Sequence, residues 1–253
     1  MARLEKIERH LEQFLHVGQF SDACPNGVQV RGRRRIRKIV TGVSASLELF
    51  QVALERKGDA ILVHHGLIWD KDSRIIEGSM RRRLGILLKH DLTLLAYHLP
   101  LDAHPGLGNN VLLLRGLGIE KLEPFGHYHH QNISFMGSLN QGVSLEKIIK
   151  RVKKTLPHAT PMVLPWGGKK IVRIAVCSGG APELIREAKA RGADLFLTGE
   201  VGEPIHYLAR EEKIHCIAAG HHATETLGVH ALGDHLARKF GIGHHFHDTR
   251  NPF

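Results

Sequence analysis

The chain has 253 residues, of which 42% are hydrophobic and only 6% aromatic, so aliphatic side chains must form most of a sizeable core. No apolar stretch approaches the roughly 20 residues of a membrane helix, and the N-terminus lacks the apolar segment of a signal peptide. Cys24, Cys177 and Cys216 form no CxxC pair, which argues against disulfide scaffolds and thiolate zinc knuckles and favours the cytoplasm.

The net charge of +10 is concentrated in two clusters, one between Arg31 and Lys38 and one at Arg81, Arg82 and Arg83. Basic clusters attract phosphates, nucleotides or nucleic acid, but they are equally compatible with a solvated face or an oligomer contact. No aromatic residue interleaves with these arginines, which weakens the case for stacking on single-stranded nucleic acid.

Apolar periodicity predicts alternating helices and strands along the chain, with a turn at Pro25-Asn26-Gly27. The predicted elements, in chain order, are a helix at 3–16, a strand at 36–43, a helix at 46–57, strands at 59–65 and 92–98, a helix at about 110–116, a helix near 144–154, and a strand at 214–219. Asn109 is the predicted N-cap of the helix at 110–116. The region of about 124–170 is predicted to be rich in loops.

A faint internal repeat links the two halves of the chain, at an offset of 135 from residue 39 to residue 174. The matching residues are Ile39, Glu48, Ala53, Arg56, Asp59 and Leu62 with Ile174, Glu183, Ala188, Arg191, Asp194 and Leu197. Both segments have the pattern strand, helix, strand, which is a βαβ unit with parallel strands. The predicted fold is therefore α/β, with two similar α/β lobes in which His65 and Glu200 end equivalent strands.

Three apolar strands end directly at side chains that bind metals. They present His64-His65, His98 with Asp102, and His221 with Glu225. Sites in parallel α/β sheets form at the carboxyl ends of strands, so these three segments are expected at the same edge. His64 and His65 would share a metal only if the chain bends at Gly66, because neighbouring strand residues point to opposite faces; otherwise they serve two neighbouring metals.

Three histidines and two carboxylates suit two metal ions with one bridging carboxylate. A shell of nitrogen and oxygen donors without thiolate fits Zn, Mn, Fe, Co or Ni. Each residue also has an ordinary interpretation, since His64 could be a packed histidine, Asp102 a turn former before Pro105, and Glu225 a first-turn helix acid. His98 is interpreted as a group that faces substrate or supports a ligand.

The other histidine clusters lack a strand end with carboxylates, and we assign them no ligand role. These are His127, His129 and His130, and the C-terminal group His244, His245 and His247.

The motifs together resemble the Nif-three-like family, whose bacterial members are labelled GTP cyclohydrolase I type 2 homologs. They are PNGVQV at 25–30, HHGLIW at 64–69, YHLPLDAHPGLGNN at 97–110, TGE at 198–200 and GHHATE at 220–225. The resemblance implies a metal-binding lobe from residues 1–124 and 220–253 and a related lobe from 125–219. It also implies a toroidal homohexamer holding two divalent metal ions per chain, with His64, His65, Asp102, His221 and Glu225 as ligands and Glu225 touching both ions.

The resulting hypothesis is a metal-dependent hydrolase of a nucleotide or related phosphorylated small molecule, with His98 or Glu200 as proton shuttle. A second hypothesis is a non-enzymatic ring that carries metal or binds nucleic acid or protein, with no membrane partner. A dinucleotide-binding dehydrogenase is disfavoured, because the turn from Gly42 to Ser46 is not GxGxxG.

Overall fold

The computed structural model describes residues 1–253 and divides into two compact units. Unit 1 comprises Met1–Leu101 and Gly228–Thr249, and unit 2 comprises Asp102–Leu227 and Arg250–Phe253. These bounds differ from the expected lobes of 1–124 plus 220–253 and 125–219. Residues 102–124 belong to unit 2 because helix α5 (Asn109–Gly116) packs against strands and a helix of that unit.

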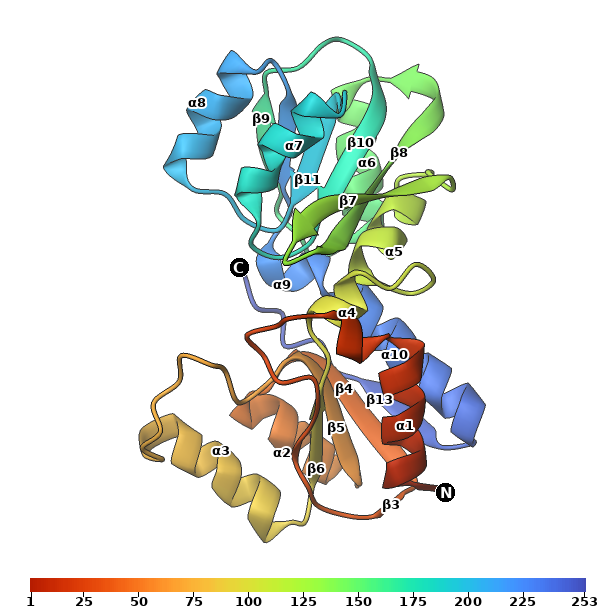
Figure 1. The fold of residues 1–253 in the computed structure, drawn as a ribbon, viewed down its shortest axis with the longest axis vertical. Coiled ribbons are helices and arrows are strands. Elements are labelled where there is room, and N and C mark those ends of the chain that lie inside the picture. Colours follow the sequence, from red (N-terminus) through yellow and green to blue (C-terminus); the bar gives the residue numbers. More distant parts are fainter. The chain divides into compact units, whose positions relative to one another are not determined.

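Unit 1 is built on a five-stranded sheet in the order β13-β4-β5-β6-β2 (Figure 1). Its strands are β2 (Gly27–Val30), β4 (Lys38–Ser44), β5 (Ala60–His65), β6 (Thr93–Ala96) and β13 (Gly243–Phe246). All but β2 run parallel, and β2 is an antiparallel edge strand beside β6. Two further short strands, β1 (Ala2–Arg3) and β3 (Arg35–Ile36), pair with each other.

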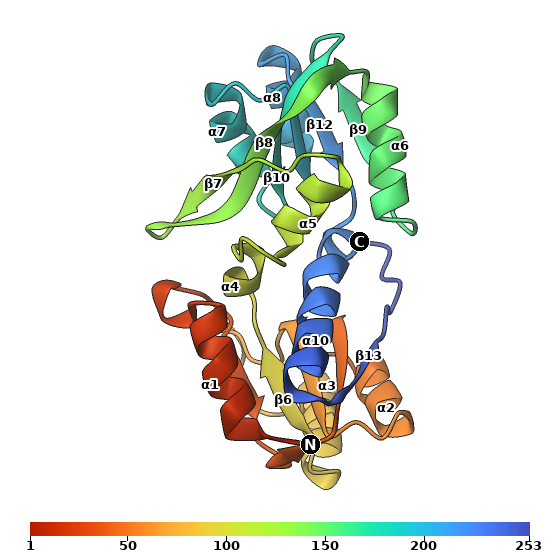
Figure 2. The same cartoon turned by 90° about the vertical axis from the view of Figure 1, so that its right-hand side faces the viewer.

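Helices cover both faces of the unit 1 sheet (Figures 1 and 2). The covering helices are α1 (Leu4–Phe14), α2 (Leu47–Glu55), α3 (Gly78–Lys89) and α10 (Thr226–Phe240). The short 3-10 helix η1 (Val17–Gln19) follows α1, and α4 (Leu99–Asp102) follows β6. Ser46 caps α2, and its hydroxyl accepts a hydrogen bond from the Leu49 amide at 3.2 Å. The predicted helices at 3–16 and 46–57 and the strands at 36–43, 59–65 and 92–98 are confirmed, with ends shifted by a few residues.

Unit 2 contains a six-stranded sheet in the order β7-β8-β10-β11-β12-β9. Its strands are β7 (Leu122–Tyr128), β8 (Gln131–Val143), β9 (Met162–Pro165), β10 (Ile171–Cys177), β11 (Leu195–Thr198) and β12 (His215–Ala218). Its helices are α5, α6 (Leu145–Thr155), the 3-10 helix η2 (Pro182–Leu184), α7 (Ile185–Ala190), α8 (Glu203–Glu211) and α9 (His221–Thr224). No helix in either unit is both long and apolar enough to span a membrane.

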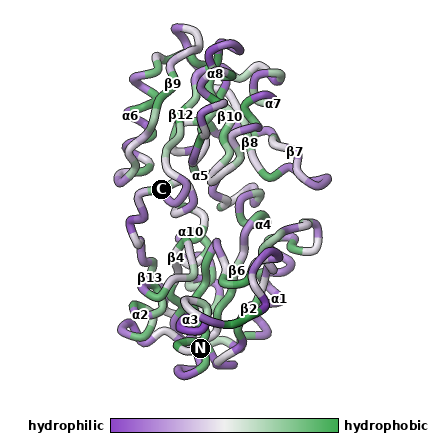
Figure 3. Tube along the Cα trace, turned by 90° about the vertical axis from the view of Figure 1, so that its left-hand side faces the viewer, coloured by the Kyte–Doolittle hydropathy of each residue, from purple (hydrophilic) through white to green (hydrophobic).

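The prediction of a loop-rich region at 124–170 is wrong, because β7 and β8 form an antiparallel hairpin. His129 and His130 form its turn with positive φ values of 42° and 69°. Two central residues with positive φ define the turn that matches the twist of paired strands. The prediction failed because glycine or asparagine usually signals such a turn, whereas here two histidines form it. The tip of the hairpin is hydrophilic (Figure 3).

The register of the two sheets confirms the internal repeat. Ile39 pairs with Ala60 between β4 and β5, and Ile174 pairs with Leu195 between β10 and β11, so both pairs differ by the predicted offset of 135. In each unit the third parallel strand, β6 or β12, borders an antiparallel edge strand, β2 or β9. Each third strand is also followed by a four-residue helix, α4 or α9.

Two aspartates play the same part in the two units. Asp59 accepts hydrogen bonds from the amides of Arg37 and Lys38 at 2.7 and 3.2 Å. Asp194 accepts them from the amides of Val172 and Arg173 at 2.8 and 2.9 Å. Each carboxylate thus ties the start of one parallel strand to the start of the next, which explains why the repeat retains an aspartate at this position.

Replacing Asp59 should destabilise unit 1 in a pH-dependent way. Burial alone would raise its pKa, but hydrogen bonds from Arg37, Arg33 and Lys38 outweigh burial and lower it from 3.8. The stabilisation is therefore present above the ordinary value and is lost as the pH falls through the lower folded value. Asp59→Asn should lower the free energy of unfolding by about 1–3 kcal/mol at pH 7.

Urea unfolding at pH 7 and in acid measures this effect, and the difference between wild type and variant should shrink in acid. Asp70→Asn is the control, because Asp70 is exposed and its change should stay within about 0.5 kcal/mol. Equal stability of wild type and Asp59→Asn at pH 7 would show that the carboxylate contributes nothing to the fold.

Candidate metal centre

Unit 1 gathers three imidazoles where its parallel strands end. His64 and His65 end β5, and His98 lies between β6 and α4. The His64 ring centroid lies 4.8 Å from that of His65 and 4.9 Å from that of His98. One ring nitrogen of each lies within 4.8 Å of those of the other two. The two adjacent histidines therefore contribute to one cluster, although successive strand residues usually diverge.

Hydrogen bonds orient each ring of this cluster. Nδ1 of His64 lies 3.0 Å from the Tyr97 carbonyl oxygen, which can only accept, so the proton is on Nδ1 and Nε2 is the basic nitrogen. Nδ1 of His65 lies 3.2 Å from the Ser44 hydroxyl. A hydrogen bond at one nitrogen that leaves the other basic is the arrangement by which proteins prepare a histidine for metal binding.

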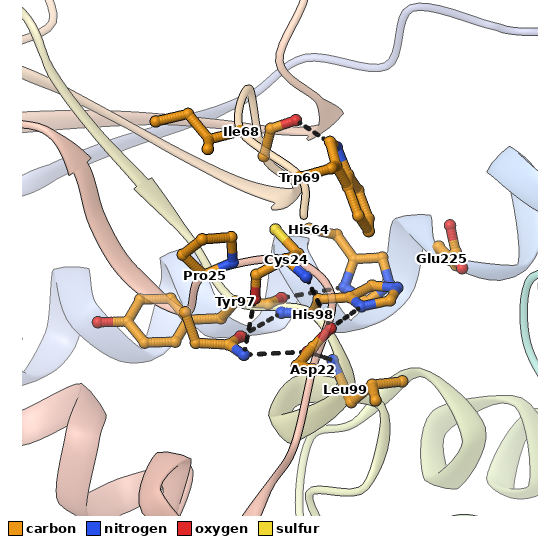
Figure 4. A network of polar contacts seen from close by, with 12 residues as sticks. Asp22, Cys24, Pro25, His64, Ile68, Trp69, Tyr97, His98, Leu99 and Glu225 are labelled. Atoms are coloured by element: carbon orange, nitrogen blue, oxygen red, sulfur yellow. Dashed lines mark hydrogen bonds and ion pairs between the residues drawn. The ribbon is translucent and has the colours of Figure 1, made fainter. Parts of the chain in front are cut away.

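His98 is held by Asp22, a residue that the sequence did not single out. The Asp22 carboxylate lies 2.8 Å from Nδ1 of His98 and accepts the amides of Cys24 and Leu99 at 3.1 and 3.0 Å (Figure 4). Burial alone would raise the pKa of Asp22, but hydrogen bonds led by that from His98 lower it to about 2. Asp22 is therefore ionised, and it orients His98 and the start of α4. Its only sequence signal is its position before the Pro25-Asn26-Gly27 turn.

Trp69 forms an aromatic wall beside the same cluster. Its ring centroid lies 6.0 Å from that of His65 and 5.2 Å from that of His98. The indole nitrogen donates to the Gly66 carbonyl at 3.1 Å, which fixes the ring over the turn after β5.

Unit 2 gathers carboxylates and one imidazole. Glu225 and Asp102 are 2% and 7% exposed, and His221 is half-buried at the start of α9. Nε2 of His221 lies 3.4 Å from Glu225 Oε1, and Nδ1 lies 3.4 Å from Glu200 Oε2. The hydrogen bond with Glu225, aided by Glu200, raises the pKa of His221 to about 9 despite its burial.

The Asp102 carboxylate is oriented by two side chains, from Asn109 at 2.8 Å and from Ser178 at 3.0 Å, both donating to Oδ1. Asn109 is thus not an N-cap as predicted, because α5 begins at Asn109 and Gly108 is its N-cap. Ser178 follows β10 and was missed, since a lone serine after a strand carries no specific sequence signal.

Gly179 leaves room for the carboxylate of Glu225. A Cβ at this glycine would overlap Glu225 Oε1 and lie 3.2 Å from His221 Nε2. Gly179 also has a positive φ of +66°, which residues with a side chain rarely adopt. Its amide donates a hydrogen bond to the Thr224 hydroxyl at 3.1 Å, which holds the backbone in this conformation. The turn after β10 and the start of α9 therefore fit together only with glycine at this position.

The structure brings the predicted residues together within each unit. Unit 1 contains His64, His65 and His98, and unit 2 contains Asp102, His221, Glu225 and Glu200. All are imidazole or carboxylate donors, and the three cysteines are buried free thiols in which burial raises the pKa. The donor chemistry fits a divalent ion such as Zn, Fe, Mn, Co or Ni.

Intramolecular ion pairs occupy part of the first basic cluster. Arg31 pairs with Glu8 at 2.7 Å, and Arg33 pairs with the buried Asp59 at 2.9 Å.

A separate pocket of about 460 Å³ in unit 1 carries four cationic side chains and no acidic one. Its lining residues are Met1, Ala2, Arg3, Lys6, Arg35, Lys239 and Phe240.

The chain is similar to known proteins in both sequence and fold. The family model of Duf34/NIF3 (NGG1p interacting factor 3) matches residues 2–252. A Pseudomonas aeruginosa protein named GTP cyclohydrolase 1 type 2 homolog is 44% identical over 98% of both chains. The solved structure of protein ybgI, described as of unknown function, is 37% identical with a TM-score of 0.93 over 100% of both chains. TTHA1606 from Thermus thermophilus is 34% identical with a TM-score of 0.89 over 97% of both chains.

Replacing Gly179 by alanine should displace the Glu225 carboxylate and reduce metal binding. Gly192→Ala is a matched control, because Gly192 also has a positive φ, of +79°, but nothing within 4 Å of an added Cβ. Both variants should lose about 1–2 kcal/mol from backbone strain. Only Gly179→Ala should bind less metal, measured by elemental analysis after dialysis against Zn²⁺. Equal metal contents in the two variants would contradict this account of the glycine.

Proposed function

Because the chain belongs to the Duf34/NIF3 family, we propose that it is a dinuclear metal protein that hydrolyses a nucleotide or a related phosphorylated small molecule. The observation that carries this proposal is the set of oriented imidazole and carboxylate donors at the strand ends of each unit. Packing alone does not require a buried histidine, aspartate and glutamate at these ends, since burying such groups is costly.

We assign His64 and His65 of unit 1 and Asp102, His221 and Glu225 of unit 2 as ligands of two divalent ions. Glu225 is proposed as the carboxylate that touches both ions. When bound, such ions lower the pKa of a coordinated water and polarise the bond to be cleaved. His221 must lose its proton to act as a ligand, and the removal of that proton is coupled to metal binding.

The chain's own residues then orient groups and move protons. Asp22 holds the proton of His98 on Nδ1, so Nε2 is the nitrogen that exchanges protons with substrate. Glu200 is exposed beside Nδ1 of His221 and can pass a proton to solvent. Asn109 and Ser178 both donate buried hydrogen bonds to Oδ1 of Asp102, so Oδ2 is directed away from these two side chains.

The proposed substrate class rests on two considerations. Curated relatives carry a name that refers to a GTP cyclohydrolase, which points to nucleotide chemistry. The net charge of +10 favours the approach of an anionic substrate by long-range attraction.

Glu225→Gln should lower both the metal content and the turnover of any active nucleotide by more than about 100-fold, since even groups that only support a ligand contribute 10–100-fold. Purified protein loaded with each candidate metal would be assayed for hydrolysis against a panel of nucleotides. Glu203→Gln is the control, because this exposed residue of α8 lies in the same unit without contact to the donors.

His65→Ala should lower metal content as Glu225→Gln does, because both residues are proposed ligands. Unchanged metal content in both variants would refute the ligand assignment. Unchanged turnover with reduced metal content would refute the hydrolase assignment and leave a metal carrier.

A second candidate function is a ring that binds nucleic acid, and the cationic pocket of Arg3, Lys6, Arg35 and Lys239 favours it. For this function we propose the homohexamer that the family resemblance implies. Arg35 and Lys239 are better probes than Arg33, whose charge already pairs with Asp59.

Reversing both charges in Arg35→Glu with Lys239→Glu should weaken DNA binding at least about tenfold at low salt, because phosphate contacts dominate there. Fluorescence anisotropy over a salt series measures the affinity and its slope. Arg74→Glu with Lys71→Glu changes the net charge equally at exposed positions outside the pocket and serves as the control. Absence of DNA binding by the wild type at low salt would exclude this function.

A further inference from the structure

A second group of metal-binding side chains lies in unit 1, apart from the strand ends described above. His230 and Asp234 lie one turn apart on α10, and His244 lies on the neighbouring edge strand β13. Ring nitrogens of the two histidines and a carboxylate oxygen of Asp234 all lie within 4.8 Å of one another. His244 could not be selected from the sequence, because its partners come from a helix that precedes it rather than from its own strand end.

The distances within this group suit a single ion. Nδ1 of His244 lies 2.8 Å from Asp234 Oδ1, and Nε2 of His230 lies 3.7 Å from Asp234 Oδ2. A tetrahedral ion with bonds of about 2.1 Å separates its donors by about 3.4 Å. The two measured distances lie on either side of this value, so rotation of the exposed His230 and Asp234 side chains would bring the donors closer to it.

Thr41 and the backbone at Gly233 orient the His244 ring so that its Nδ1 faces Asp234. Its Nε2 lies 2.8 Å from the buried Thr41 hydroxyl, whose oxygen can accept a hydrogen bond from Nε2–H when Nδ1 binds a metal. Its side chain is only 6% exposed, and the ring lies against α10 where Gly233 has no side chain. A Cβ at Gly233 would overlap the ring, so the glycine makes room for this histidine.

His230 is positioned by stacking. Its ring lies parallel to Phe246 with centroids 4.6 Å apart and an interplanar angle of 6°. A hydrogen bond between Asp234 and His244 alone would join α10 to β13 without any need for His230. The stacked ring instead places a second imidazole at the same carboxylate.

We propose that His230, Asp234 and His244 form a mononuclear site for a divalent transition ion, with Zn²⁺ as the probe of choice. Two imidazoles and one carboxylate are a common three-residue shell for zinc, and the side chains of His230 and Asp234 are 51% and 47% exposed, which leaves access for water as a further ligand. The ion joins α10 to β13, so it stabilises the edge of the unit 1 sheet. This inference is independent of the proposed hydrolase activity.

The test compares zinc stoichiometry in two backgrounds of the full-length chain. One background is wild type, and the other is His65→Ala with Glu225→Gln, which lacks ligands of the proposed dinuclear centre. In both, adding His230→Gln with Asp234→Asn should remove one zinc ion per chain in titrations against a chromophoric chelator. The loss is expected even if the strand-end residues bind no metal, so failure of that centre does not obscure the result.

A thermal measurement tests the link between α10 and β13. Zn²⁺ should raise the Tm of the ligand-lacking background, because it binds only the folded state, and should not raise it after His230→Gln with Asp234→Asn. His245→Gln is the control, because His245 is half-buried next to His244 on β13 but lies outside the cluster. Equal zinc stoichiometry with and without the two substitutions would overturn the proposal, as would an equal loss in His245→Gln.

Discussion

The constraint on which the rest of the structure depends is that polar donors are buried at the carboxyl ends of strands and must be hydrogen-bonded there. His64 is fully buried, and Glu225 and Asp102 are nearly so. Burying such groups without partners would cost several kcal/mol each, on the order of the whole stability of a domain. The Tyr97 carbonyl, Asn109 and Ser178 satisfy part of this requirement. The same bonds orient the donors, so stability and metal chemistry have a common cause.

The two units meet this constraint with one scaffold but different donors. Their parallel strands share a register, and Asp59 and Asp194 join strand starts in the same way. Unit 1 uses the last residues of β5, whereas unit 2 uses α9, the helix that follows its third parallel strand. A duplicated frame has thus become imidazole-rich in one copy and carboxylate-rich in the other. The Duf34/NIF3 relationship extends over both copies, since the match covers residues 2–252.

Features that depend on residues close together in the sequence were predictable, whereas features that depend on distant residues were not. The first βαβ unit was predictable because its apolar periodicity and Gly66 act within a few residues. The β7–β8 hairpin was not, because two histidines adopt positive φ values that sequence rules reserve for glycine and asparagine. Asn109 was assigned to a local cap, but it bonds to Asp102 instead, and no local rule distinguishes these roles. Asp22 was missed for a similar reason, as its partner His98 lies far along the chain.

The sequence by itself determined the α/β class, the repeat and the identity of the donor residues, because strand ends and their polar residues are local features. Only the tertiary structure decided which donors are neighbours within a unit and which groups orient them. It also decided that His230, Asp234 and His244 belong together, because α10 and β13 bring them into reach after folding. Side chains that the sequence separates become a site only when packing fixes their distances, and periodicity carries no information about those distances.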